Sequence, residues 1–163
     1  KYLLVEFPML EVPNYSESMI YNLKLSGYTP IIAHPERNAM IIENPNILYD
    51  FIKKGALAQL NTGSLTGMYG DDVRNAAEIL VTHDMIHLLG TDAHSSRGRT
   101  PRVAESLRRL SDIVDPQLLN DLCYKNNKLV ITNGDLIVRE PLRYEKKKRS
   151  GIRGLFKNLV KRR

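Results

Sequence analysis

Thr29-Pro-Ile-Ile-Ala-His34-Pro35 is the segment from which the fold class of this 163-residue chain is best inferred. It is a short apolar run of about the length of one strand, and Pro35 is expected to hold His34 extended and to end the run. Similar runs occur at 2–7, 56–60 and 85–90. Apolar runs without alternation are typical of strands buried on both faces of a parallel sheet.

The segments between and after these runs have the residue spacing of helices. The expected helices lie at about 14–26, 45–54, 71–82, 101–111 and 116–126. Asp71 or Asp72 is the expected amino-terminal cap of the third helix. Strands that alternate with helices indicate βαβ units and an α/β fold with a parallel sheet. Because a complete β/α barrel needs ~250 residues, four units predict either an open sheet or part of a barrel.

Polar residues recur at the ends of the expected strands. Glu6, His34, Asn61 and Asp92 are separated by 28, 27 and 31 residues, each about one strand, one helix and two loops. The carboxyl ends of parallel strands share one edge of a sheet, and active sites of such folds form at that edge. These residues are therefore expected to converge.

Four residues near these strand ends are types that bind metals. Carboxylates and imidazoles in this mixture hold Mn, Fe or Zn, and the candidate ligands are Glu6, His34, Asp92 and His94. Asp92-Ala-His94 places two of them on one face of an extended segment, or at a strand end that turns into a loop. The alternative is that the histidines are ordinary hydrogen-bonded residues and that Glu6 pairs with a basic neighbour. The spacing alone leaves both interpretations open.

Arginines follow two of the candidate ligands. Arg37 comes three residues after His34, and Arg99 comes five residues after His94. A planar guanidinium binds phosphate oxygens in bidentate fashion, so arginines beside a metal cluster indicate a phosphate ester as substrate. The simpler alternative is that Arg37 and Arg99 form surface salt bridges. Arg97 competes with Arg99 for the phosphate-binding role, and the spacing does not separate them.

Four motifs occur in order along the chain: Leu4-Val-Glu6-Phe-Pro8, Ile32-Ala-His34-Pro-Glu-Arg37-Asn38, Gln59-Leu-Asn-Thr-Gly-Ser64-Leu-Thr-Gly67 and Gly90-Thr-Asp92-Ala-His94-Ser-Ser-Arg-Gly-Arg99. Together they closely resemble the bacterial manganese-dependent protein-tyrosine phosphatases of capsule and exopolysaccharide operons, in the polymerase and histidinol phosphatase (PHP) superfamily. The resemblance covers about residues 1–140. It implies a distorted (β/α)7 barrel, present here as about four β/α units followed by C-terminal helices and a basic tail. The family's opening His-x-His segment has no counterpart, so the chain resembles the C-terminal two-thirds of such an enzyme.

The resemblance also implies roles for individual residues. Glu6, His34, Asp92 and His94 match metal ligands of a three-metal site, and Arg37 and Arg99 match the arginines that bind the substrate phosphate. The implied cofactor is Mn²⁺, with Fe and Zn as alternatives, and the implied reaction is attack of a metal-activated hydroxide on phosphotyrosine. The implied partner is a tyrosine-phosphorylated bacterial kinase of polysaccharide biosynthesis.

Two other functions are compatible with the same residues. A PHP phosphoesterase for a small molecule such as histidinol phosphate would share the metal ligands, whereas a non-catalytic interaction module would carry an incomplete site. A cysteine-dependent tyrosine phosphatase is disfavoured because Cys123 has Leu129 where the C-x5-R motif needs arginine. Cys123 is expected to be a small buried hydrophobe, and His83 and His87 are expected to be structural.

The basic charge of the chain is concentrated at its C-terminus. Residues 143–163 carry a net charge of +9, while the other 142 residues carry −3, so nucleic-acid binding by the folded part is disfavoured. Residues 141–163 are expected to form a separate basic tail in which 152–160 have amphipathic helical spacing, suited to an anionic membrane surface. A single cysteine and the absence of a run of ~20 apolar residues favour a cytoplasmic protein, peripheral at the inner face of the plasma membrane.

Overall fold

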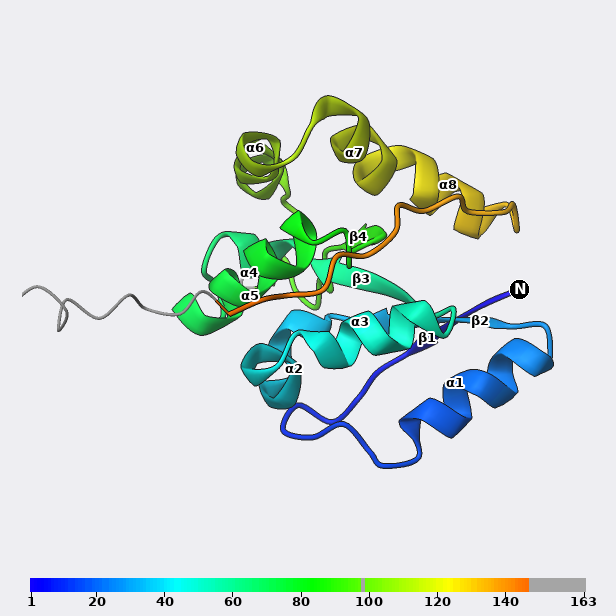
Figure 1. The fold of residues 1–163 in the computed structure, drawn as a ribbon. Helices are drawn as coiled ribbons and strands as arrows, with labels where there is room; N and C mark the ends of the chain where they lie inside the picture. The colour runs from blue at the N-terminus through cyan, green and yellow to red at the C-terminus, as the bar shows by residue number, and fades with distance from the viewer. Residues whose placement is uncertain (98, 147–163) are drawn as a thin grey trace, which may run out of the picture.

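The computed structural model describes residues 1–97 and 99–146 and contains a four-stranded, fully parallel sheet. The strands are β1 (Tyr2–Val5), β2 (Thr29–Ala33), β3 (Leu57–Asn61) and β4 (Leu88–Gly90), and they pair in sequence order (Figure 1). The four apolar runs are thus confirmed as strands of a parallel sheet. The first and fourth strands are shorter than expected: β1 ends at Val5 instead of Phe7, and only the last three residues of 85–90 belong to β4.

The main helices after the first three strands fall where the sequence predicts them. The helical elements are α1 (Ser16–Leu25), η1 (Pro35–Arg37), α2 (Ala39–Glu43), α3 (Asn46–Lys53), α4 (Thr62–Leu65), α5 (Asp71–Thr82), α6 (Ala104–Ile113), α7 (Pro116–Asn120), η2 (Asp121–Lys125) and α8 (Asn126–Ile131). The predicted cap of α5 is wrong: Gly70, with φ +97°, precedes the helix, and both aspartates lie in its first turn. There they still face the positive end of the helix dipole.

The predicted helix at 116–126 continues to Ile131. It is built from α7, the single π turn η2 and α8, which follow one another without a break. A π turn inserts an extra residue into the helical hydrogen-bond pattern, and η2 is where Cys123 lies.

The sheet is apolar on both faces. Ile32 and Ala58 are opposite each other in the register and belong to the large core cluster, which also contains buried side chains of α1, α3, α5 and α6. Ile31 and Leu57, one position earlier, pack on the other face with Leu88. Successive residues of a strand point to opposite faces, so this pattern explains why the runs do not alternate. Each buried Ile or Leu contributes roughly 1.5–3 kcal/mol, which fixes the strand ends that carry the polar residues.

The last described segment runs back across the body. Figure 1 shows it passing from α8 towards α3 and α5, where Leu142 donates its N–H to the His83 carbonyl at 2.8 Å. Asn46 of α3 exchanges hydrogen bonds of 3.0 and 2.9 Å with the backbone of Tyr144. The chain therefore contacts the body up to Tyr144. The predicted amphipathic helix at 152–160 lies outside the described residues.

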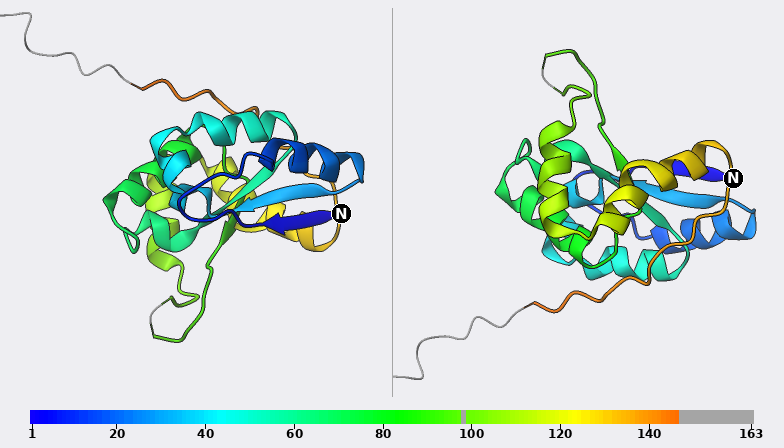
Figure 2. Two further views of the ribbon diagram at one scale, coloured as in Figure 1. Left: turned by 90° about the horizontal axis from the view of Figure 1, so that it is seen from below. Right: turned by 90° about the horizontal axis from the view of Figure 1, so that it is seen from above.

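The loop between β4 and α6 protrudes from the body, as both views of Figure 2 show. It begins at Thr91 and ends at Val103, and it carries Asp92, His94 and the arginines that follow them. None of the helices within residues 1–97 and 99–146 is both long and apolar enough to cross a membrane.

Candidate metal and phosphate site

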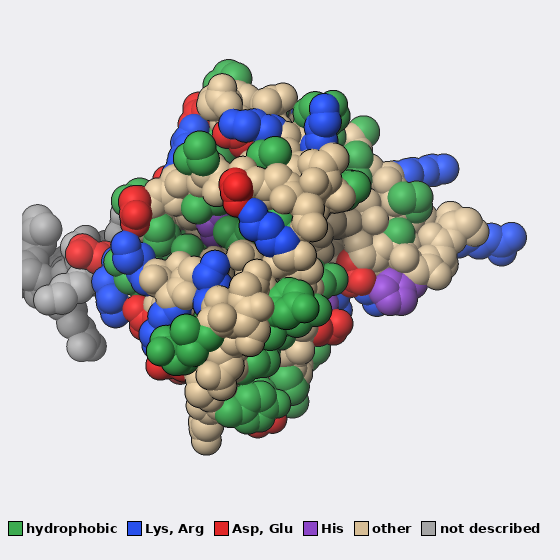
Figure 3. Space-filling view, turned by 90° about the vertical axis from the view of Figure 1, so that its right-hand side faces the viewer, with side chains coloured by type: hydrophobic (Ala, Val, Ile, Leu, Met, Phe, Trp, Pro, Cys, Tyr) green, Lys and Arg blue, Asp and Glu red, His purple; other side chains and the backbone are tan. Residues whose placement is uncertain are grey.

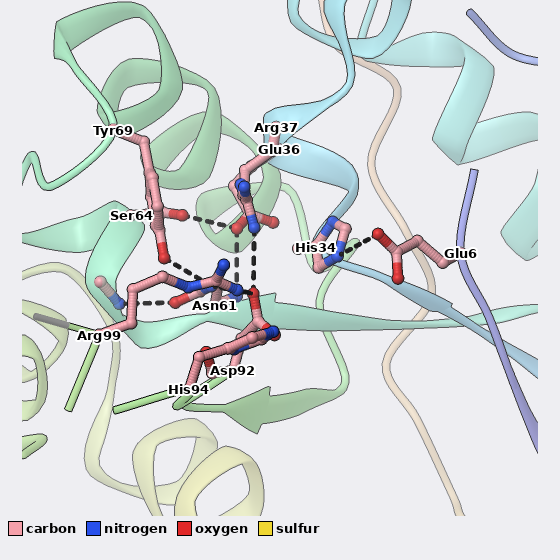
Figure 4. A network of polar contacts seen from close by, with 11 residues as sticks. Glu6, His34, Glu36, Arg37, Asn61, Ser64, Tyr69, Asp92, His94 and Arg99 are labelled. Atoms are coloured by element: carbon pink, nitrogen blue, oxygen red, sulfur yellow. Dashed lines mark hydrogen bonds and ion pairs between the residues drawn. The ribbon is translucent and has the colours of Figure 1, made fainter. Parts of the chain in front are cut away.

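The predicted site residues lie at the carboxyl edge of the sheet. Glu6 follows β1, His34 follows β2, Asn61 ends β3 and Asp92 follows β4. Figure 4 shows their side chains gathered along this edge together with Arg37 and Arg99. Hydrogen bonds connect the ends of β2, β3 and β4, as the sequence spacing predicts.

Glu6 and His34 form one pair. His34 Nε2 lies 3.3 Å from Glu6 Oε1, with the imidazole 10% exposed and the carboxylate 63% exposed. The extended conformation predicted for His34 is wrong, because its φ of +34° and ψ of +53° are left-handed. The strand ends at Ala33, the His34 N–H still bonds the Gln59 carbonyl, and Pro35 opens the turn η1 instead of extending the strand.

Asp92 collects three donors on one oxygen. Its Oδ2 accepts from Arg37 Nη1 at 3.0 Å, from Asn61 Nδ2 at 3.2 Å and from Arg99 Nη2. Asp92 also has a left-handed backbone, with φ +48°. Non-glycine residues in this region are uncommon and cluster at functional sites. Of the two competing arginines, Arg99 is the one brought to Asp92, whereas Arg97 is exposed.

His94 is held by the backbone of Asp92. Its Nδ1 lies 2.7 Å from the Asp92 carbonyl oxygen and 3.5 Å from Asp92 Oδ1. A carbonyl can only accept, so Nδ1 is the donor in this contact, and in the neutral ring Nε2 then has the lone pair that a metal would use. The segment Asp92-Ala-His94 lies in the loop that follows β4, which is the second of the two arrangements that the sequence allows.

The four candidate ligands form two pairs. No three His, Cys, Asp or Glu side chains come together as a metal cluster within residues 1–97 and 99–146. Glu6 and His34 make one pair and Asp92 and His94 the other, and the charge of Asp92 is balanced by Arg37 and Arg99. The donor types suit a divalent cation, and His94 Nε2 and Asp92 Oδ1 lie outside the bonds to the arginines. These residues fit part of a metal site.

Glu36 is a buried carboxyl beneath this edge that the sequence analysis did not single out. Its side chain is fully buried, and its Oε1 accepts from Ser64 Oγ at 2.6 Å and from the Asn61 N–H at 3.1 Å. Burial raises the pKa of Glu36 to about 7, against the opposing effect of the hydrogen bond from Ser64. Its position between two candidate residues, His34 and Arg37, is the only sequence signal that could have drawn attention to it.

Tyr69 is a second neighbour that the sequence does not mark. Arg37 stacks over its ring with 4.3 Å between guanidinium carbon and ring centroid, and its hydroxyl lies 3.2 Å from Asn61 Nδ2. Beside Arg99, a cavity of about 330 Å³ opens between α4 and the start of α6. The edge thus presents an aromatic ring and two arginines around the carboxylate of Asp92.

Within the described residues, two of those expected to be structural take no part in the hydrogen bonds and ion pairs of the candidate site. Cys123 is half-buried in η2, and burial raises the pKa of its thiol, the opposite of what an activated nucleophile needs. His87 is buried just before β4, at the other end of the strand, where its Nδ1 accepts from the Ala58 N–H at 3.0 Å.

A parallel sheet with polar residues gathered at its carboxyl edge defines the chain as an α/β protein of the kind that places active sites there. Residues 1–132 match the family described as "Capsular polysaccharide synthesis, CpsB/CapC", and the chain belongs to that family.

Three similar proteins extend this comparison. The chain is 36% identical over 155 residues to "Tyrosine-protein phosphatase YwqE" of Bacillus subtilis, covering 93% of this chain and 59% of the relative. It is 38% identical over 156 residues to "Putative tyrosine-protein phosphatase CapC" of Staphylococcus aureus, covering 93% and 60%. A crystal structure from work on YwqE of Bacillus subtilis and CpsB of Streptococcus pneumoniae, described as "unique metal-dependent tyrosine phosphatases", superposes with a TM-score of 0.85 at 37% identity, covering 89% of this chain and 58% of that one. The chain thus spans about 60% of the length of these relatives.

Proposed function

We propose that this chain is part of a metal-dependent phosphotyrosine-protein phosphatase that acts on a kinase of capsule or exopolysaccharide synthesis. The observation that carries the proposal is the convergence of Arg37 and Arg99 on Asp92, among metal-binding side chains, in a chain of the CpsB/CapC family. The names of the relatives support the same activity, since YwqE is named a tyrosine-protein phosphatase and CapC a putative one.

The proposed active protein is longer than this chain and forms a (β/α)7 barrel. The four strands pair in sequence order, as strands of a barrel do, and the relatives are longer. On the edge strand β1, Leu3 and Leu4 are 43% and 59% exposed. Hydrophobic side chains are also exposed in the lower half of Figure 3, where α1 lies. Burial of this surface by further barrel units would be favourable.

Glu6, His34, Asp92 and His94 are the proposed metal ligands on this chain, with Mn²⁺ as the proposed cation. Divalent cations held there would supply an activated water as nucleophile and neutralise phosphate charge. The two pairs Glu6–His34 and Asp92–His94 are short of a closed coordination shell, so the remaining ligands are assigned to the part of the protein that completes the barrel.

Arg37 and Arg99 are the proposed phosphate-binding residues. Each bonds the same Asp92 oxygen through one terminal nitrogen, and the other donors of each fork can turn to a phosphoryl group. A phosphoryl group in transfer carries its charge on three equatorial oxygens, which two guanidiniums on one side can stabilise. Stacking on Tyr69 limits the rotation of Arg37 and so reduces the entropy lost on binding.

The C-terminal tail is proposed to bring the enzyme to its substrate. A kinase of polysaccharide export works at the membrane, and residues 147–163 carry a net charge of +8. Each basic residue near an anionic leaflet contributes ~1 kcal/mol to membrane binding. We therefore place the protein in the cytoplasm, peripheral at the inner face of the plasma membrane.

Chelation tests the proposed metal mechanism. In the protein encoded by the complete gene, removal of divalent metals should abolish hydrolysis of a phosphotyrosine peptide, and Mn²⁺ should restore it. His34→Ala and Asp92→Ala should each lower kcat far more than Cys123→Ser, the matched control for thiolate chemistry. Turnover that survives exhaustive chelation would contradict the proposal, as would a folded Cys123→Ser variant without activity.

A further inference from the structure

The buried Glu36 connects the turn after β2 to the end of β3 and the start of α4. It lies in η1, between His34 and Arg37, and its Oε1 bonds both the hydroxyl of Ser64 and the backbone N–H of Asn61. The turn η1 follows β2, whereas Asn61 is the last residue of β3 and Ser64 lies in α4. Glu36 thus ties the turn that presents His34 and Arg37 to the neighbouring strand end.

Asn61 continues this connection to the end of β4. Its backbone N–H is held by Glu36, and its side-chain amide donates to Asp92 Oδ2 at 3.2 Å. Asp92 in turn bonds Arg37 at 3.0 Å. The contacts therefore form a closed circuit from Glu36 through Asn61 and Asp92 to Arg37, which is covalently next to Glu36 (Figure 4).

Stability alone gives a poor account of a carboxyl at this position. Burying a carboxyl is unfavourable unless its oxygens are hydrogen-bonded, and Glu36 Oε2 has no hydrogen-bond partner within the described residues. An apolar side chain would fill the same space without that penalty. What an apolar side chain could not do is accept from Ser64 and Asn61 at once.

We propose that Glu36 is a positioning residue that sets the place of the Arg37 guanidinium relative to Asp92. This inference rests on the proposed function, in which Arg37 binds the substrate phosphate. Glu36 is fully buried and is not among the proposed metal ligands or phosphate-binding residues. It acts through the turn η1 on one side and through Asn61 on the other.

Four variants of the full chain test this role. Glu36→Leu removes both hydrogen bonds, and Ser64→Ala removes one of them with little change in volume, so it keeps the test valid if the first variant does not fold. Glu36→Gln keeps an acceptor at the Oε1 position and is the conservative variant. Asn126→Ala is the matched control, because Asn126 is a buried side chain that bonds the His87 carbonyl at the opposite end of the sheet.

The first measurement needs neither metal nor substrate. In spectra of chain labelled with ¹⁵N-arginine, the Arg37 side-chain signal, assigned with Arg37→Lys, should shift in Glu36→Leu and less in Ser64→Ala. It should keep its wild-type position in Asn126→Ala and stay close to it in Glu36→Gln. An Arg37 signal unmoved in both Glu36→Leu and Ser64→Ala would overturn the inference and leave Glu36 with a role in stability alone.

The second measurement uses the metal-loaded protein encoded by the complete gene. Glu36→Leu should lower kcat/KM for a phosphotyrosine peptide about tenfold or more, as expected when a binding group is displaced by a fraction of an ångström. Glu36→Gln should recover most of this loss. Equal losses of kcat/KM in Glu36→Leu and Asn126→Ala would contradict positioning. If the wild-type protein hydrolyses no phosphotyrosine, the proposed function fails, and the arginine spectra still decide the inference.

Discussion

At the scale of single residues, Asp92 and its two arginines govern the charge of the site. One carboxylate oxygen accepts from Arg37, Arg99 and Asn61, so the arginines are already directed to the same point before any phosphate binds. Such preorganisation would remove part of the entropic cost of the phosphate binding that we propose for these arginines. The contact with Asp92 also distinguishes these two arginines from Arg97, which is exposed on the loop that carries Arg99.

Arg37→Ala and Arg99→Ala are each expected to lower kcat/KM for a phosphotyrosine peptide by ~10²–10³, the cost of removing one preorganised contact to the transition state. Lysine at either position should restore only part of the activity, since a point charge cannot replace the bidentate fork. Steady-state kinetics with metal content measured in parallel check this. Arg97→Ala is the matched control, and a severe defect in that variant with a normal Arg99→Ala would reverse the assignment.

His87 makes the stability of the fold depend on pH. Burial lowers the pKa of His87 from 6.5 to about 4, because a charged ring would be desolvated there. Between these values the unfolded chain binds a proton that the folded chain does not. The contribution of His87 to the free energy of unfolding should therefore fall as the pH drops from about 6.5 to 4, by up to about 3 kcal/mol, whereas the raised pKa of Glu36 acts in the opposite direction between about 7 and 4.5.

Denaturant unfolding at a series of pH values between 7 and 4 measures this effect. His87→Asn keeps an acceptor for the Ala58 N–H without titrating in this range, so the stability of the wild type relative to this variant should fall as the pH drops, because Glu36 contributes equally to both. The control variant is His83→Asn, at the half-buried C-terminal end of α5. Identical pH profiles for wild type and His87→Asn would show that His87 is not the group responsible.

At the scale of elements, the strands and long helices were predictable because their patterns are strong. Four apolar runs mark β1 to β4, and three helical segments separate them. The short elements α2, α4 and η1 were not predicted, because three to five residues are too few to show the hydrophobic period of a helix. The left-handed backbone of His34 was not predicted either. A residue before proline prefers an extended conformation, and the geometry of η1 overrides that preference here.

The candidate site was predictable in its residue types and only partly in its contacts. Regular spacing in the sequence places Glu6, His34 and Asp92 at one edge, and the structure does bring them there. The two-pair arrangement and the buried Glu36 could not be predicted, because they depend on side-chain directions and on packing between loops that are distant in sequence. Tertiary contacts of this kind leave no periodic signal.

The packing of α5 on the sheet gives a prediction at the same scale. Leu80 is fully buried in the large core cluster, so Leu80→Ala should destabilise the fold by ~2–5 kcal/mol through lost contacts and a residual cavity. Thermal unfolding of the full chain measures this as a lower Tm. Ile131→Ala, at a helix position that is 85% exposed, is the control and should change Tm little. Similar shifts in the two variants would mean that α5 does not pack as described.

At the scale of the whole molecule, charge is divided between the body and the tail. The first 142 residues carry a net charge of −3, and the face in Figure 3 shows acidic and basic side chains interspersed over the described residues. Residues 147–163 carry +8 without a single acidic residue. Attraction to an anionic surface is therefore expected to come from the tail, while the candidate site lies on loops of the body.

Deletion of residues 147–163 should separate membrane binding from catalysis. This deletion leaves the Asn46–Tyr144 contact intact, so hydrolysis of a small phosphotyrosine mimic should stay nearly unchanged. Binding to vesicles rich in anionic lipid should fall sharply, and the binding of the intact protein should weaken as salt screens the charges. Vesicle sedimentation of both forms at low and high ionic strength measures this, with vesicles of neutral lipid as control. Equal, salt-independent binding of the two forms would leave the tail without an anchoring role.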